Sequence, residues 1–254
     1  MHEHAREKKL IVAAVFAAAL AGVVVYARHD ARPPAPPAPS VNAAPAVVGS
    51  VLGEEDTRSA GLPDPSTPAE TLTAAEGETR YRITAGSKAS FTINEMLRGE
   101  PKTVIGITED VTGDIALDAA AGKARIGLIA IDARTLLTDS RGRNGMLAKF
   151  ILKSAEPGNE YITFKPTSID GLPAALEEGS PFDFSITGDL TVSGTTKPVT
   201  FKAAAQLAPG DKIVGKADAT ILYKDFGISI PSVPMVAGVD DDLKLSIDLI
   251  AEKG

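Results

Sequence analysis

The side chains that carry out most enzyme chemistry are scarce in this chain. Its three histidines, His2, His4 and His29, all precede residue 30, and cysteine is absent. The rest of the chain therefore lacks a histidine general base, a Ser-His-Asp triad, a cysteine nucleophile and a thiolate metal site. Carboxylates and lysines remain, but they form no compact catalytic motif. We predict that the protein is not an enzyme, has no catalytic residues and needs no cofactor.

A run of acidic residues near the C-terminus also fails as a metal site. Asp240, Asp241 and Asp242 are consecutive. Side chains alternate between the two faces of a strand, so three neighbours cannot converge on one ion. The spacing also lacks the pattern of a calcium-binding EF-hand loop. We predict no metal site and interpret these residues as the start of a charged strand.

The segment DSRGRNGMLAKFILK, residues 139–153, contains four basic residues, and the first three of them are Arg141, Arg143 and Lys149. Guanidinium and ammonium groups bind carboxylates and phosphates, so these side chains are candidates for contact with an anionic head group. A solvated basic loop is the alternative. The net charge of −7 argues against the basic surface that nucleic-acid binding requires, and we predict no nucleic-acid partner.

Alternating apolar and polar residues predict that β-strands position most of the chain after residue 80. In residues 182–192 and 199–207 apolar side chains occupy every second position apart from Gly188, which is typical of a strand with one covered face. Ser193–Thr196 supplies turn residues between them, so the pair predicts a β-hairpin. Similar alternation recurs in residues 217–223 and 243–249. About eight such strands predict an all-β antiparallel sandwich or barrel.

One segment, residues 139–153, interrupts this alternation. Its apolar residues between positions 146 and 151 have helical spacing, and Asp139 or Ser140 can cap a helix that begins there. We predict a short helix or ordered loop across one mouth of the barrel.

An eight-stranded barrel is either filled with side chains or encloses one small ligand. Strand parity turns a set of apolar side chains inward. We predict that they line an apolar ligand-binding cavity, and they are Phe91, Ile93, Phe164, Phe182, Phe184, Ile186, Phe201, Ile221 and Leu245. Four small inward residues could leave the necessary space: Ala203, Ala205, Ala217 and Ala219. In the alternative, these side chains form an ordinary core and the interior is filled.

The N-terminal part of the chain predicts a membrane anchor and a linker. Residues 10–26, LIVAAVFAAALAGVVVY, carry no charge, and a helix of this length, at ~1.5 Å per residue, approaches the thickness of a bilayer's hydrocarbon core. We predict a cytoplasmic N-terminus at residues 1–9. Residues 10–27 are predicted to be a signal-anchor that crosses the cell membrane once. Val25-Tyr26-Ala27 leaves open a cleaved signal peptide and secretion.

Residues 28–79 are rich in proline and acidic residues and contain no aromatic residue. Such a composition cannot bury enough apolar area to offset its ordering entropy, so it predicts a disordered linker. In either case the domain at residues 80–254 is predicted to be extracytoplasmic.

Short motifs follow one another along this domain. They are Thr103–Gly106 with Thr112–Ile115, then Tyr161–Lys165, then Ile186–Thr200 and Tyr223–Ile228. Their order and spacing resemble those of the YceI-like family, which comprises lipid- or polyisoprenoid-binding domains, and the resemblance covers nearly all of the domain. It implies a lipocalin-like antiparallel β-barrel that holds a long isoprenoid chain in an apolar interior.

This chain has Gly86, Glu95 and Ser193 where many members of that family carry histidine, so the roles of those histidines are not carried over. The first functional hypothesis is a membrane-anchored module whose partner is a polyisoprenoid or similar long-chain lipid. Two alternatives stay open: an envelope interaction protein with a filled barrel, and an enzyme that acts on a lipid through carboxylates. A homodimer is compatible with each of them.

Overall fold

The computed structural model describes residues 71–231 and 236–254. The predicted signal-anchor at residues 10–27 and residues 28–70 of the predicted linker lie outside the described residues. Within the described part of the chain, no helix has the length and apolar character needed to cross a membrane.

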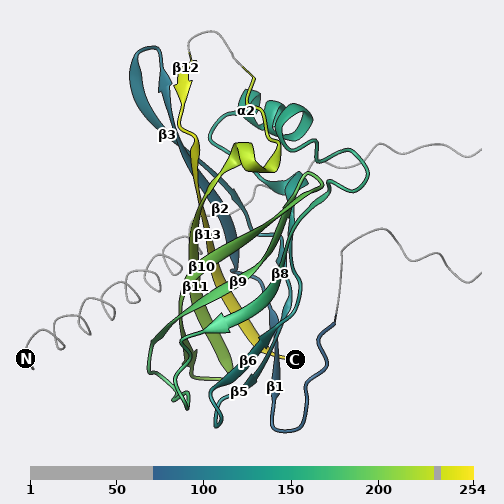
Figure 1. Cartoon of the computed structure of the whole chain (residues 1–254), viewed down its shortest axis with the longest axis vertical. Coiled ribbons are helices and arrows are strands. Elements are labelled where there is room, and N and C mark those ends of the chain that lie inside the picture. Colours follow the sequence, from purple (N-terminus) through teal and green to yellow (C-terminus); the bar gives the residue numbers. More distant parts are fainter. Residues whose placement is uncertain (1–70, 232–235) are drawn as a thin grey trace, which may run out of the picture. The chain divides into compact units, whose positions relative to one another are not determined.

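The described residues form one antiparallel sheet that curls around an apolar interior (Figure 1). Neighbouring strands follow the order β4-β7-β8-β9-β10-β11-β13-β1-β5-β6, β2 pairs with β13, β3 and β12, and only Gly113 separates β4 from β5 along the chain. The strands are β1 (Thr79–Ile83), β2 (Lys88–Leu97), β3 (Glu100–Thr108), β4 (Val111–Thr112), β5 (Asp114–Asp118), β6 (Lys123–Ile126), β7 (Ile129–Asp132), β8 (Tyr161–Asp170), β9 (Phe182–Val192), β10 (Thr195–Ala208), β11 (Lys212–Leu222), β12 (Val236–Val239) and β13 (Asp242–Lys253).

The sheet contains thirteen strands rather than about eight because several long runs are interrupted. Short breaks separate β1 from β2, β3 from β4 and β5, β6 from β7, and β12 from β13. At the first break, Gly86 adopts a positive φ of 95°. The buried hydroxyl of Ser87 there accepts a hydrogen bond from the backbone N–H of Ile250 (3.0 Å) and donates one to its carbonyl (3.1 Å). One side chain thus replaces the missing ladder bonds and lets β13 pair with both β1 and β2.

The predicted hairpin is present as β9 and β10, which pair from Thr195 with Val192 to Ala205 with Phe182. The turn is shorter than the predicted four residues. Ser193 (φ 47°) and Gly194 (φ 76°) suffice, because two consecutive positive φ angles give the tight turn that matches strand twist. Pro198 therefore lies inside β10, opposite Asp189.

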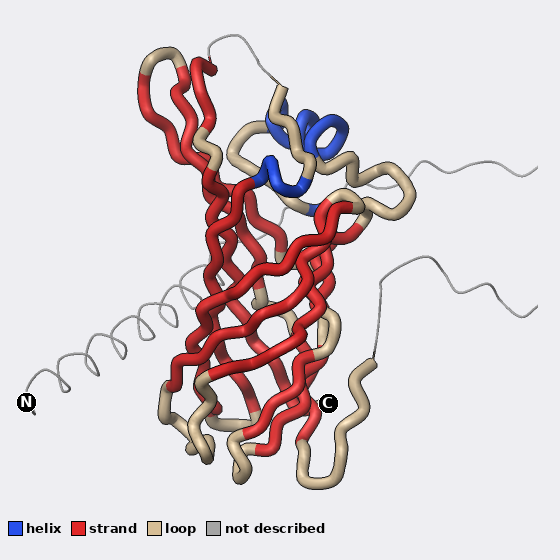
Figure 2. Tube along the Cα trace, in the orientation of Figure 1, coloured by secondary structure: helices blue, strands red, loops and turns tan. Residues whose placement is uncertain are grey.

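Helical segments gather at one end of the sheet (Figure 2). They are η1 (Ala133–Thr135), α2 (Arg141–Met146), η2 (Leu147–Ile151) and η3 (Tyr223–Phe226). The predicted cap of α2 is confirmed: the hydroxyl of Ser140 accepts a hydrogen bond from the backbone N–H of Arg143. The β9–β10 turn lies at the same end, since the hydroxyl of Ser193 donates to the carbonyl of Leu152 at 2.8 Å.

Residues just before β1 contact the folded domain, although their composition belongs to the predicted linker. The backbone N–H of Leu72 donates to the carboxylate of Asp114 at 3.3 Å. Arg125 on β6 donates to the carbonyl of Thr73 and to the carboxylate of Glu78, each at 2.9 Å. The hydrogen bonds from Arg125 lower the pKa of Glu78 to about 2, with a smaller contribution from the backbone N–H of Ala75.

Replacing Arg125 with glutamine is expected to raise the pKa of Glu78 towards the ordinary value of 4.5. Because the folded-state pKa is depressed, this contact stabilises the fold above the ordinary pKa and is lost as the pH falls through about 2. A pH titration of the Glu78 carboxyl carbon by NMR measures the shift. Arg134→Gln, which removes the partner of Asp132 instead, serves as the control. An unchanged Glu78 titration in Arg125→Gln would contradict the assigned cause.

Candidate functional site

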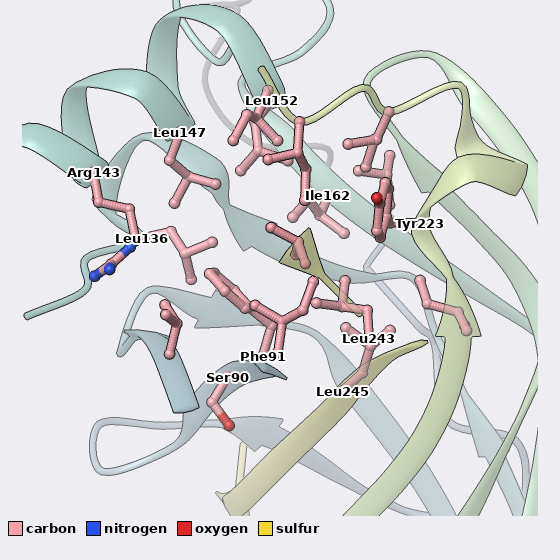
Figure 3. A pocket seen from close by; sticks show the side chains of 18 of the residues that line it. Ser90, Phe91, Leu136, Arg143, Leu147, Leu152, Ile162, Tyr223, Leu243 and Leu245 are labelled. Atoms are coloured by element: carbon pink, nitrogen blue, oxygen red, sulfur yellow. The ribbon is translucent and has the colours of Figure 1, made fainter. Parts of the chain in front are cut away.

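A cavity of about 490 Å³ occupies the end of the curled sheet near the helical segments. This volume falls within the range of roughly 300–1,000 Å³ that is usual for small-molecule sites. Figure 3 shows that Phe91 and Leu245, on the strands, face the same space as Leu147, on the helical segment formed by α2 and η2. The lining is almost wholly apolar, and besides these residues it includes Val104, Leu136, Leu152, Ile162, Leu190, Val192, Ile228, Ile230 and Leu243.

A smaller cavity of about 90 Å³ lies deeper in the sheet. Its lining combines isoleucines with small residues, which include Ala203, Ala205, Gly215 and Ala217. Three of the four small inward residues of the sequence analysis, Ala203, Ala205 and Ala217, thus border an open space, whereas Ala219 lines neither cavity.

The cavities account for most of the predicted inward side chains. Phe91, Ile93, Phe164, Phe201, Ile221 and Leu245 line the larger cavity. Phe184 and Ile186 line the smaller one, together with Phe164 and Phe201. Phe182 lines neither cavity; its ring lies 5.7 Å from that of Phe184, within a second apolar cluster around Tyr81 and Ile115.

The helical segment contributes lining residues that strand parity could not identify. Leu147, Ile151 and Leu152 border the larger cavity, whereas Phe150 is 57% exposed. A regular helix would place Phe150 near Leu147, but η2 is a π-helical turn in which the N–H of Leu152 bonds to the carbonyl of Leu147. The wider turn shifts the angular positions of the side chains and directs Phe150 away from the cavity. Helical spacing indicated the segment but not this shift.

The three predicted basic residues separate in the structure. Arg141 and Lys149 are exposed and line neither cavity, whereas Arg143 borders the larger one. The guanidinium of Arg143 donates to the carboxylate of Glu95 at 2.9 Å and also to that of Asp139. Asp139 in turn pairs with Lys102 at 2.9 Å. The positive charge at the cavity wall is therefore already balanced by two carboxylates.

Replacing Glu95 with glutamine is expected to release part of this balance. The Glu95 side chain is 10% exposed and lines the cavity beside Arg143, so its carboxylate repels an anion that approaches the guanidinium. Glu95→Gln should therefore increase affinity for farnesyl phosphate by about tenfold relative to farnesol, since a partly buried charge pair contributes on the order of 1–2 kcal/mol. Competition of the two compounds against a fluorescent lipid measures the ratio. Glu100→Gln, a substitution of an exposed residue of β3, is the control and should leave this affinity ratio unchanged. An equal ratio in the wild type, Glu95→Gln and Glu100→Gln would contradict the proposed repulsion by Glu95.

Metal coordination finds no support in the described ranges. Within residues 71–231 and 236–254, no three histidine, cysteine or acidic side chains lie close enough to hold a metal ion. Among the consecutive aspartates, Asp240 accepts a hydrogen bond from the amide of Asn94 at 3.0 Å. Asp241 forms an ion pair with Lys224 instead of converging with its neighbours.

An antiparallel sheet curled around an apolar cavity, with a helical segment across one end, defines a lipocalin-like domain. The model of the YceI-like domain family matches residues 81–251, and the chain belongs to this family. UPF0312 proteins from Shewanella sp. strains ANA-3 and MR-7 are each 29% identical to it over 168 residues, which cover 62% of this chain and 81% of the relative.

Two solved structures share the fold. One is a polyisoprenoid-binding domain from Saccharophagus degradans implicated in plant cell wall breakdown, with a TM-score of 0.53 and 15% identity over 68% of this chain and 98% of that chain. The other is BcnA from Burkholderia cenocepacia, with a TM-score of 0.50 and 20% identity over 65% of this chain and 95% of that chain. At these identities the likeness establishes the fold alone.

Proposed function

We propose that the domain binds a polyisoprenoid or similar long-chain lipid, with the hydrocarbon chain inside the larger cavity. The observation that carries this proposal is an apolar space of about 490 Å³ bordered by side chains from both the strands and the helical segment. Such a space disfavours the alternative of an interior filled with side chains. The polyisoprenoid-binding domain from Saccharophagus degradans, which has the same fold, supports the choice of ligand class.

Burial of hydrocarbon supplies the binding free energy. Each Å² of apolar ligand surface withdrawn from water contributes about 25 cal/mol before the cost of ordering the chain. A chain of fifteen carbons has several hundred Å² of such surface, so micromolar or tighter binding requires no polar contact. Such binding fits a role in the sequestration or transport of a lipid, or in protection against stress, and none of these roles needs a catalytic group.

We further propose that residues 10–27 anchor the protein in the cell membrane and that residues 28–70 act as a spacer to an extracytoplasmic domain. The uncharged run of residues 10–26 and the proline-rich composition after it support this arrangement. A cleaved signal peptide would give the same exported domain without the anchor, and N-terminal sequencing of the mature protein separates the two.

Mass spectrometry of organic extracts from the purified full-length chain tests the binding function. We expect a prenyl or other long-chain lipid to co-purify and to be replaced by added farnesol. Extracts without lipid, combined with no measurable uptake of any added prenol, would contradict the proposal. Conversion of an added lipid into a product would instead favour the enzyme hypothesis.

A further inference from the structure

We propose that the rings of Phe164 and Phe201 form a partition inside the sheet that sets the length of hydrocarbon the larger cavity accepts. This inference rests on the proposed lipid-binding function and adds a specificity-determining element to it. No sequence motif indicates the partition, because it depends on where two side chains from different strands meet.

The two cavities have three lining residues in common: Phe164, Phe201 and Ile247. The two rings are buried and lie edge to face, with centroids 5.0 Å apart and planes at 70°. They come from β8 and β10, on either side of β9, and the residue of β9 next to the Phe164 ring is Gly188. A Cβ atom there would lie 2.7 Å from the tip of the Phe164 ring, so glycine is what lets that ring extend across the interior.

Open space continues beyond the partition. Ala203 pairs with Ala217 and Ala205 with Gly215 on adjacent strands β10 and β11, and together they leave the smaller cavity of about 90 Å³. Among the described residues, the three that line both cavities are all apolar. A hydrocarbon chain that enters from the helical end therefore stops at the rings while apolar space remains beyond them.

The volumes set the expected chain lengths. A methylene group is about as large as a water molecule, whose share of liquid volume is about 30 Å³, so the larger cavity holds on the order of 15 such groups, or about three isoprene units. Additional units would protrude from the mouth and stay in water, so they would add little affinity. Removal of one ring would join the cavities and add room for roughly one to two further units.

The test measures the affinity of the full-length chain for all-trans prenols of two to six isoprene units. In the wild-type protein we expect affinity to rise with chain length to about three units and then to level off. In Phe201→Ala the plateau should move to four or five units. The affinity for the four-unit prenol relative to the three-unit prenol should increase about tenfold or more, because a further isoprene unit becomes buried.

A second substitution ties this shift to the smaller cavity. Ala203 lines only the smaller cavity, and the three carbons that Ala203→Leu adds take up about the 90 Å³ of that cavity, so Phe201→Ala/Ala203→Leu should move the plateau part of the way back towards three units. Ile247→Ala opens the same partition from a side chain on β13 that is only partly buried. It should shift the plateau in the same direction even if Phe201→Ala does not fold.

The outcomes separate this inference from the function on which it rests. A wild-type protein that binds none of the prenols would overturn the lipid-binding function itself. A wild-type protein that binds prenols, with a plateau left unmoved by both Phe201→Ala and Ile247→Ala, would overturn the partition alone. A shift of the same size in the double variant would also overturn it, because the smaller cavity would then play no part.

Discussion

Replacing Gly188 with alanine is expected to lower the free energy of unfolding by about 3 kcal/mol or more, a large part of the stability of an ordinary domain. The added Cβ atom would lie 2.5 Å from the carbonyl oxygen of Lys165 and 2.8 Å from the Cα atom of Pro166. Both are backbone atoms of the neighbouring strand β8, so relief requires β8 and β9 to move apart. The Phe164 ring, 2.7 Å away, adds a further clash.

Thermal and urea denaturation measure this loss, and the same substitution at Gly145 is the matched control. Gly145 lies in α2, and a Cβ atom there meets nothing within 4 Å. Alanine favours a helix over glycine by up to about 1 kcal/mol, so Gly145→Ala should be neutral or slightly stabilising. Equal melting temperatures for the two variants would refute the close approach of β8 and β9.

Replacing Leu245 with aspartate is expected to abolish lipid uptake while leaving most of the fold intact. Leu245 lines the larger cavity, between Ala219 on β11 and Phe91 on β2. A carboxylate there would have to lose its hydration when a hydrocarbon chain enters, which reduces affinity for farnesol by about a hundredfold or more. Without ligand the cavity has room for water around the carboxylate, so the folding cost is smaller than in a filled core.

Displacement of a fluorescent lipid measures the uptake, and circular dichroism with thermal melting measures the fold. Thr220→Asp is the matched control, because Thr220 is exposed on the outer face of β11 and pairs with Lys244, the neighbour of Leu245. It introduces the same charge outside the sheet and should bind farnesol as the wild type does. If Leu245→Asp also retained wild-type affinity, the larger cavity would not be the binding site.

Local pattern was sufficient to predict the elements of the fold. The alternation in β9, β10, β11 and β13 follows from the two-residue period of a strand, and the structure has these strands with the expected faces inward. The short helix and its serine cap were equally local signals. Which side chains of η2 face the cavity was not predictable from the sequence. The π-helical turn that exposes Phe150 depends on how η2 packs over the cavity.

The candidate site was predicted less completely, for a physical reason. Arg143 was a candidate for contact with an anionic head group, but its carboxylate partner Glu95 lies 48 positions away and meets it only when β2 and α2 come together. The hydrogen bond from Arg125 to Glu78 likewise joins two segments that the sequence analysis had separated, the linker and the domain.

The sequence by itself determined the class of elements, the inward parity and the absence of histidine and cysteine chemistry after residue 30. The tertiary structure alone decided that the interior is hollow, that it contains cavities of about 490 and 90 Å³, and that two phenylalanine rings line both of them. The reason is that the volume of a cavity is the difference between the volume that the sheet encloses and the total volume of the side chains inside it. That difference depends on strand pairing between residues far apart in the chain, which no local period records.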